Sequence, residues 1–335
     1  MLRTAVVGLG WWGRIISQTI AGHSRKLRVV RGVDPNLAAA AEFARPLGFP
    51  VSKRLDEVLR DPEVEAVVIA TPHTLHEDQI VAAARAGMHV FAEKPLGLTL
   101  ASARRSIDAC HAGGVVLGIG HERRFEPPQV DLRRLCETGE LGTLMQIEAN
   151  FSHDKFVGLP PDNWRLSPEQ APAGGMTATG IHLLDLAITL LGPAERVLAH
   201  SRTLASGLPS GDSLSVLVEF RSGASATINV MMATPFVSRF AAFGSRGWVE
   251  IRDKTHVENP TGWLMTRAKP GGAPTTVDYG KATPVLTNLE AFADAVRGMA
   301  PYPVSAVQML RTVAALEAVF RSARSGTPQA VEDVG

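Results

Sequence analysis

The stretch that decides the fold is Gly8-Leu9-Gly10-Trp11-Trp12-Gly13, which follows an apolar run and precedes a helical pattern. In the pattern G-x-G-x-x-G, the first glycine allows a tight turn and the second lets a ligand approach the backbone. The third lets the helix pack closely on the strand. Such a turn also presents the free N–H groups of a helix N-terminus to an anion. The stretch therefore predicts a strand, turn and helix that bind the pyrophosphate of a dinucleotide.

Short apolar runs alternate with helical patterns through about the first 120 residues. The apolar runs lie at residues 4–8, 27–34, 66–70, 89–92 and 115–118, and the helical patterns at residues 12–21, 37–47, 75–86 and 101–112. Strands that alternate with helices form parallel sheets through right-handed crossovers. Because these runs are apolar along their whole length, both faces of the sheet are expected to be covered. The pattern predicts an α/β protein with an N-terminal Rossmann doubly wound parallel sheet.

The second half of the chain changes character. Its apolar runs are longer and richer in Thr, Ser, Val and Phe, and Leu214, Val216, Val218 and Phe220 alternate with more polar residues. A period of two is typical of strands with one buried face. Helical patterns lie at residues 177–191, 286–298 and 305–324. We expect a C-terminal α+β domain with a large, mainly antiparallel open sheet.

Two domains follow from these patterns. The first covers residues 1–121 and binds the dinucleotide, and the second covers residues 122–335 and serves substrate binding and oligomerisation. Packing of the closing helix, at residues 305–324, against the N-terminal domain is an alternative. The loop at residues 155–175 holds four prolines and is long for a compact domain, which is typical of functional loops.

Composition excludes several classes of partner. The formal net charge is +1 and no run of like charges occurs, which argues against nucleic acid or an anionic membrane as the partner. No window of about 18 apolar residues is present, so no membrane span is expected. Cys110 and Cys136 are isolated, and no spacing of histidines and cysteines predicts a metal site. With no targeting segment at the start, the expectation is a cytoplasmic protein with a small-molecule substrate.

Asp34 ends the second predicted strand, where a carboxylate accepts hydrogen bonds from the adenosine ribose. It would repel a 2′-phosphate, so the sequence favours NAD and leaves NADP open. A structural role for Asp34 is the alternative. In that role it starts the turn formed with Pro35 and Asn36 and caps the next helix. The direction of the nearby Arg31 side chain is not fixed by the pattern.

Further motifs follow in a specific order. They are Ala70-Thr71-Pro72-His73-x-x-His76, Glu93-Lys94-Pro95, Arg123-Arg124-Phe125-Glu126-Pro127, Trp164-Arg165, Gly174-Gly175, Gly180-Ile181-His182-x-x-Asp185 and Asn288-Leu289-x-x-Phe292. Together with the glycine turn, they make the chain closely resemble the Gfo/Idh/MocA family, that of glucose-fructose oxidoreductase and inositol dehydrogenase. The resemblance covers nearly the whole chain. Each motif is weak alone, but their number and order are specific.

The resemblance implies an NAD(P)-dependent dehydrogenase or reductase acting on CH–OH groups, with a sugar, polyol or related cyclic hydroxy compound as substrate. It also implies a homodimer or homotetramer formed through the open sheet. The cofactor-binding residues expected from the motifs and the resemblance are Gly8, Gly10, Trp11, Trp12, Gly13, Asp34, Thr71, Pro72, His73, His76, Glu93, Lys94, Arg123, Trp164 and Arg165. The expected substrate-binding residues are Lys94, Arg124, His153, Arg165, Thr179, His182 and Asp185.

Lys94 and His182 are the expected catalytic residues. Lys94 follows a parallel strand at the end where ligands bind, and a buried lysine beside an oxidised nicotinamide can have a lowered pKa. In the family this lysine is the recurrent catalytic residue. The resemblance gives His182 the role of proton shuttle or substrate ligand, with Asp185 on the same helical side to orient it. Each residue also has a structural alternative. Lys94 would then be a surface residue paired with Glu93, and His182 would be a core side chain with its hydrogen bonds satisfied.

Ala178 departs from the family pattern. Many members carry an aspartate four residues before the histidine, and an alanine can neither accept a proton nor hold a substrate hydroxyl. This raises the alternative of a catalytically weakened cofactor- or substrate-binding protein. A third reading keeps the enzyme but gives it an acidic or dihydrodiol ring substrate, because Arg123, Arg124 and Arg165 suit carboxylate binding. Against it, Arg123 and Arg124 have Glu122 and Glu126 as neighbours in the sequence.

Overall fold

The computed structural model describes residues 1–335 and contains two compact units. Unit 1 comprises Met1–Glu122 and Pro284–Met309, and unit 2 comprises Arg123–Thr283 and Leu310–Gly335. The predicted boundary near residue 121 falls beside the first change of unit. The predicted second domain, however, includes a segment, Pro284–Met309, that the structure assigns to unit 1. None of the helices has the length and apolar character needed to cross a membrane.

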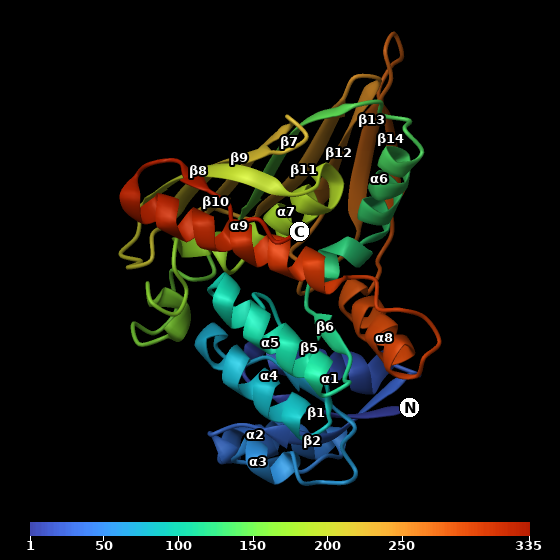
Figure 1. The fold of residues 1–335 in the computed structure, drawn as a ribbon, viewed down its shortest axis with the longest axis vertical. Helices are drawn as coiled ribbons and strands as arrows, with labels where there is room; N and C mark the ends of the chain where they lie inside the picture. Colours follow the sequence, from blue (N-terminus) through green and yellow to red (C-terminus); the bar gives the residue numbers. More distant parts are fainter. The chain divides into compact units, whose positions relative to one another are not determined.

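Unit 1 is built on a six-stranded parallel sheet with the order β3-β2-β1-β4-β5-β6 (Figure 1). The strands are β1 (Leu2–Val7), β2 (Leu27–Val33), β3 (Val51–Ser52), β4 (Ala66–Ile69), β5 (His89–Ala92) and β6 (Leu117–Ile119). The order reverses between β1 and β4, and ligands of open parallel sheets bind at such a switch point. The predicted Rossmann sheet is confirmed, and the two-residue strand β3 is an addition to it.

The helices of unit 1 are α1 (Trp11–His23), α2 (Leu37–Ala44), α3 (Leu55–Val58), α4 (His76–Arg85), α5 (Leu100–Ala112) and α8 (Pro284–Val296). The returning helix α8 completes the core, because Leu289 and Phe292 are fully buried in the same apolar cluster as Ile16 of α1. Phe292 lies edge-on to Phe91 of β5, with ring centroids 5.6 Å apart. The parallel sheet of unit 1 therefore depends on residues far along the chain.

Unit 2 is built on a nine-stranded sheet with the order β14-β13-β12-β11-β7-β10-β9-β8-β15. Its strands are β7 (Leu144–Ser152), β8 (Ala194–Arg202), β9 (Ser213–Phe220), β10 (Ser225–Met231), β11 (Val237–Gly244), β12 (Gly247–Asp253), β13 (Trp263–Ala268), β14 (Thr275–Tyr279) and β15 (Gln329–Ala330). Only β7 and β10 pair in parallel. The expected large, mainly antiparallel sheet is confirmed.

Helices cover one face of this sheet. Helix α6 (Pro127–Glu137) packs on β12 and β13, and α7 (Gly180–Leu191) packs on β7 and β10. Helix α9 (Ala306–Ser325) is joined to α7 by a hydrogen bond from Thr312 to Asp185. The buried residues of β9 alternate with exposed ones, as the period of two predicts. The other face carries solvent-exposed residues, among them Leu198 and Leu217.

Candidate functional site

The glycine turn between β1 and α1 has three glycines with different surroundings. Gly8 has φ +89°, and a Cβ on it would lie 2.9 Å from the carbonyl oxygen of Ala70. A Cβ on Gly13 would lie 1.8 Å from the carbonyl oxygen of Gly8. Around a Cβ on Gly10, in contrast, no atom lies within 4 Å. Gly8 and Gly13 are therefore required by the packing of the protein itself, and Gly10 faces open space in which a ligand group fits.

The N-terminus of α1 has the properties of an anion site. Gly10 is the N-cap residue, no side chain caps the helix, and its first turn contains no acidic residue. The first turn of a helix presents N–H groups and the positive end of the helix dipole, both of which suit an anion. Trp12 packs against the core, and Trp11 is exposed. These residues fit the pyrophosphate of a dinucleotide.

Asp34 is held at the end of β2 by the protein backbone. Its Oδ2 accepts a hydrogen bond of 2.8 Å from the N–H of Leu9, and its Oδ1 accepts one of 2.8 Å from the N–H of Asn36. The alternative of a turn residue is thus realised, but Asn36 is the residue that caps α2. Each carboxylate oxygen can accept a second bond, so ribose binding stays compatible. Arg31 forms an ion pair of 2.6 Å with Asp61.

His76 joins two loops of unit 1. Its Nδ1 lies 2.8 Å from the carbonyl oxygen of Pro95, and its Nε2 lies 3.0 Å from the carbonyl oxygen of Thr71. The side chain has no exposed surface, and burial lowers its pKa. We therefore revise the expected cofactor contact of His76 to a positioning role. His73, nearly buried, lies edge-on to His76, with ring centroids 5.8 Å apart.

Lys94 is the second residue after the buried end of β5, and its side chain is half-buried. Burial and the nearby Glu122 carboxylate raise the pKa of Glu93 to about 8. The Glu93 carboxyl packs against Gly120, where a Cβ would lie 2.5 Å from Oε2. The positive charge of Lys94 acts against this rise in pKa, so pairing of Lys94 with Glu93 remains an alternative to the catalytic role.

Arg123 of unit 2 is buried between two carboxylates. Its Nε lies 3.0 Å from Glu126, its Nη2 lies 2.7 Å from Asp253, and its guanidinium covers the ring of Phe151 at 5.0 Å. Pairing with Glu126, which was the alternative from the sequence, is therefore present. These contacts provide a structural role for Arg123, and its cofactor contact stays a prediction.

Arg124 and Asp185 form a bidentate ion pair in the core of unit 2. Arg124 donates from Nε and Nη2 to the two Asp185 oxygens, each at 2.6 Å, and both side chains are almost completely buried. Thr312 of α9 donates a third bond to Asp185 at 3.0 Å. The predicted use of Asp185 to orient His182 thus competes with an ion pair that links separate segments of unit 2.

The start of α7 differs from the prediction. The helix begins at Gly180, three residues later than expected, and a short 3₁₀ turn at Gly174–Met176 precedes it. The hydroxyl of Thr179 donates to the carbonyl of Phe151 at 2.9 Å and ties this turn to β7. Ala178 lies before the helix, between the 3₁₀ turn and Gly180. His182 is buried among apolar residues of α7.

His153 sits in an aromatic cluster at the end of β7. Its ring packs edge-on against Phe156 and His256, with centroids 5.3 and 5.4 Å away. Nδ1 accepts a bond from the N–H of Lys155, which leaves the ring proton on Nε2. Burial, followed by the charges of His256 and Lys155, lowers the pKa of His153 to about 4. A neutral ring with an Nε2–H donor is suited to bind a hydroxyl oxygen.

Trp164 and Arg165 lie in a short 3₁₀ turn of the proline-rich loop. The guanidinium of Arg165 stacks over the indole of Trp164 at 4.3 Å. Burial lowers the pKa of Arg165 to about 10, because the charged form is disfavoured away from water. The stacked pair presents a flat, partly apolar surface in this loop.

Sequence reasoning missed several polar residues that the fold brings to these positions. Glu122 adjoins Glu93, and Asp253 binds Arg123. Glu258 pairs with Lys155 and lies 3.0 Å from Nδ1 of His256. Apart from the local His256–Glu258 pair, these contacts join distant segments of the chain, so no sequence spacing reveals them.

Two family models match this chain, one in each of its two predicted domains. Residues 2–121 match the family described as "Oxidoreductase family, NAD-binding Rossmann fold", and residues 130–250 match the "GFO/IDH/MocA C-terminal domain". The chain is 30% identical over 336 residues to the 1,5-anhydro-D-fructose reductase of Ensifer adhaerens, covering 96% of this chain and 98% of the relative.

Two further proteins are similar over most of their length. The scyllo-inositol 2-dehydrogenase (NAD(+)) of Bacillus subtilis (strain 168) is 30% identical over 263 residues, 76% of this chain and 75% of the relative. The crystal structure of aldose-aldose oxidoreductase from Caulobacter crescentus, complexed with glycerol, superimposes with a TM-score of 0.87 at 26% identity, covering 98% of this chain and 99% of that one. This chain belongs to the Gfo/Idh/MocA family of NAD-binding oxidoreductases.

Proposed function

We propose that this chain transfers a hydride between NAD and a carbinol or ketone carbon of a sugar, polyol or related cyclic hydroxy compound. The observation that carries the proposal is the position of Lys94, two residues after β5 in the parallel sheet that also holds the glycine turn. Ligands of such sheets bind beyond the carboxyl ends of the strands. The names of the relatives, an inositol dehydrogenase and an anhydrofructose reductase, support the substrate class.

The proposed NAD site is centred on the glycine turn between β1 and α1. Bound NAD supplies a nicotinamide ring that accepts or returns a hydride. The open space at Gly10 and the N-terminus of α1, which has no side-chain cap, would hold its pyrophosphate. Asp34 would accept a ribose hydroxyl and repel a 2′-phosphate, and Arg31 is occupied by Asp61. These features favour NAD over NADP.

The proton chemistry is assigned to Lys94. During oxidation the amine takes the hydroxyl proton of the substrate, and during reduction the ammonium returns it. His182 is the second proposed proton carrier, and the Nε2–H of His153 is a proposed donor to a substrate oxygen. His76 holds the Pro95 carbonyl and thereby the loop that carries Lys94.

The competing readings lose part of their basis. An acidic substrate was suggested by three arginines, but Arg123 and Arg124 are engaged by buried carboxylates within unit 2. A catalytically weakened protein was suggested by Ala178, but Lys94 and His182, the residues to which proton transfer is assigned, are both present. We therefore favour an active enzyme on a neutral hydroxy compound.

The test is the substitution Lys94→Ala. We expect kcat for NAD reduction, measured at 340 nm on a panel of sugars and polyols, to fall by about 10³-fold, since a positioned acid or base contributes roughly 10²–10⁴-fold. NAD should still bind in titration calorimetry. Lys53→Ala, at an exposed lysine of the same unit, is the control and should keep full activity. Unchanged turnover in K94A would disprove the assignment.

We also propose a homodimer or homotetramer formed through the exposed face of the nine-stranded sheet. Leu198 and Leu217 are neighbours in the β8–β9 register and are 40% and 37% exposed. Exposed leucines side by side on a sheet suit a protein interface. A cytoplasmic location is proposed from the two free thiols, Cys110 and Cys136, which are typical of a reducing compartment.

A further inference from the structure

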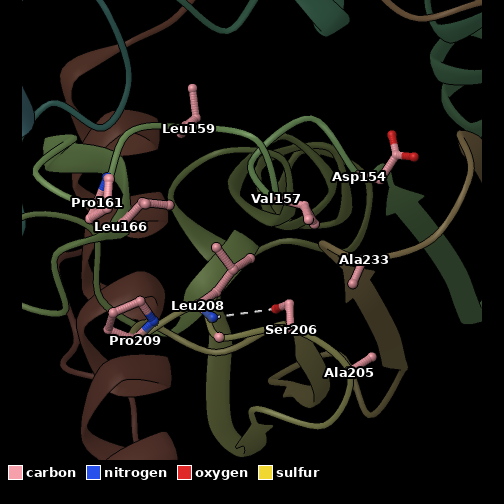
Figure 2. A pocket seen from close by; sticks show the side chains of 11 residues that line it. Asp154, Val157, Leu159, Pro161, Leu166, Ala205, Ser206, Leu208, Pro209 and Ala233 are labelled. Carbon is pink, nitrogen blue, oxygen red and sulfur yellow. Dashed lines mark hydrogen bonds between the residues drawn. The ribbon is translucent and has the colours of Figure 1, made fainter.

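A pocket of about 570 Å³ lies in unit 2 between the loop after β7 and the loop before β9 (Figure 2). This volume falls in the range of small-molecule sites. Val157, Leu159 and Leu166 line it from the first loop, and Leu208 from the second. Ala233, after β10, lies between them. Three segments of the chain therefore wall the pocket, and its lining is more apolar than polar, with Asp154 and Ser206 as the polar side chains.

The second loop forms a fixed wall, because a buried carboxylate holds it. Asp212 accepts hydrogen bonds from the N–H groups of Leu204, Ala205 and Ser206 at 2.8, 2.8 and 2.6 Å, and from the Ser206 hydroxyl at 2.9 Å. Burial alone would raise the pKa of Asp212, but these bonds overcome it and lower the pKa to about 2. The backbone donors of this wall are consumed by Asp212, so the wall offers few donors to a ligand.

The first loop satisfies its backbone in a similar way. The N–H of Leu159 donates to Phe156 and the N–H of Leu166 donates to Asn163, so short turns use the polar groups. Neither lysine nor arginine lines the pocket, and its one charged side chain is Asp154. An anionic group such as a phosphate or carboxylate is therefore disfavoured there. An uncharged apolar group gains from removing carbon surface from water.

Two lining residues are the chain neighbours of candidate substrate residues. Asp154 follows His153, and Leu166 follows Arg165. We infer that the pocket receives an apolar aryl or alkyl substituent of the substrate, whose hydroxylated ring lies toward His153. The inference rests on the proposed function and extends it. The substrate class becomes an alkyl- or aryl-substituted sugar or polyol in place of the bare compound.

The kinetic experiment compares methyl and p-nitrophenyl glycosides of the same hexoses with NAD as oxidant. For a sugar that is turned over, we expect the KM of the p-nitrophenyl glycoside to be about tenfold lower, from partial burial of the aryl ring. Val157→Asp places a carboxylate on the lining, and the ratio of the two KM values should fall to about one. Val157 is 54% exposed, so the variant is expected to fold.

Leu204→Asp is the matched control. Leu204 belongs to the second loop, is 75% exposed and does not line the pocket, so the tenfold ratio should remain. Ala233→Phe is a second pocket variant, which fills the space without adding charge and should also abolish the preference. Equal KM values for the two glycosides in the wild-type enzyme would overturn the inference, as would an unchanged ratio in both pocket variants.

A binding readout separates this inference from the proposed chemistry. Saturation-transfer NMR with p-nitrophenyl β-D-glucopyranoside detects contact of the aryl protons without turnover. Aryl saturation in the wild type and its loss in V157D would support the pocket even if no glycoside reduced NAD, a result that would count against the proposed function alone. No aryl saturation in the wild type together with no aryl preference in KM would overturn the pocket.

Discussion

The charged residues of unit 2 that resembled substrate ligands in the sequence mostly bind one another in the structure. Arg123 lies between Glu126 and Asp253, and Arg124 is joined to Asp185 through both carboxylate oxygens. A buried charge is tolerated only when it is paired and hydrogen-bonded. These pairs therefore hold segments of unit 2 together, whatever further role they have beside a substrate.

The cost of breaking such a pair can be measured with Asp185→Asn. The change leaves Arg124 charged and buried without its counter-ion, so we expect the free energy of unfolding to fall by about 3–5 kcal/mol. Urea denaturation followed by circular dichroism measures the change. Arg196→Ala, which breaks an exposed pair with Glu219, is the control and should leave the urea midpoint unchanged. A wild-type midpoint in D185N would show that the pair does not stabilise the fold.

At the scale of the elements, the turn between β1 and α1 contains two glycines with different roles. Gly13 is closely packed by the protein, and Gly10 faces open space. Gly13→Ala places a methyl group 1.8 Å from the carbonyl oxygen of Gly8, so helix and strand must move apart. We expect a loss of about 3 kcal/mol, seen as a lower thermal midpoint without cofactor. Gly10→Ala meets open space and its backbone is extended, so the midpoint should not change.

The same pair of variants tests the cofactor site. In G10A the added methyl occupies the space proposed for the pyrophosphate, and we expect the Kd for NAD to rise at least about tenfold in titration calorimetry. A folded G10A protein with wild-type NAD affinity would place the pyrophosphate elsewhere. A G13A protein as stable as the wild type would contradict the close packing at this turn.

The elements that the sequence predicted are those with strong apolar patterns. The five main strands of unit 1 and the four longer helices between them lie within a few residues of their expected bounds, because each has a buried face. β14 (Thr275–Tyr279) is almost fully exposed and β3 has two residues, so neither carries an apolar period. Helix α6 begins with Pro127 and Pro128, which suit a first turn but resemble a loop in sequence.

The candidate site was predicted less completely than the fold. Residue types and motif order predicted sites at the glycine turn, Asp34 and Lys94, since the roles proposed for them depend on local geometry. The pairing of Arg124 with Asp185, the contact of Glu93 with Glu122 and the full burial of His76 depend on which segments meet in space. A single sequence carries no period or spacing that encodes such meetings.

On the scale of the whole molecule, unit 1 is completed by Pro284–Met309, a segment that lies in the sequence between the two parts of unit 2. Asn288 and Tyr302 both donate to the carbonyl of Ile119 at the end of β6, at 2.9 and 3.0 Å. The chain therefore cannot finish its nucleotide-binding unit before nearly all of its length is present. A prediction that divides the chain at a single boundary therefore assigns residues 284–309 to the second domain.

Assembly of the whole protein is tested by Leu217→Glu on the exposed face of the sheet. In a symmetric interface the same patch meets itself, so each new carboxylate is brought toward its copy and loses water. We expect the wild type to sediment as a dimer or tetramer and L217E to associate at least about tenfold more weakly, with NAD binding retained. Leu37→Glu, at an exposed leucine in the first turn of α2, controls for added charge, since acidic residues are favoured there. A monomeric wild type, or an L217E variant that assembles normally, would exclude this face as the interface.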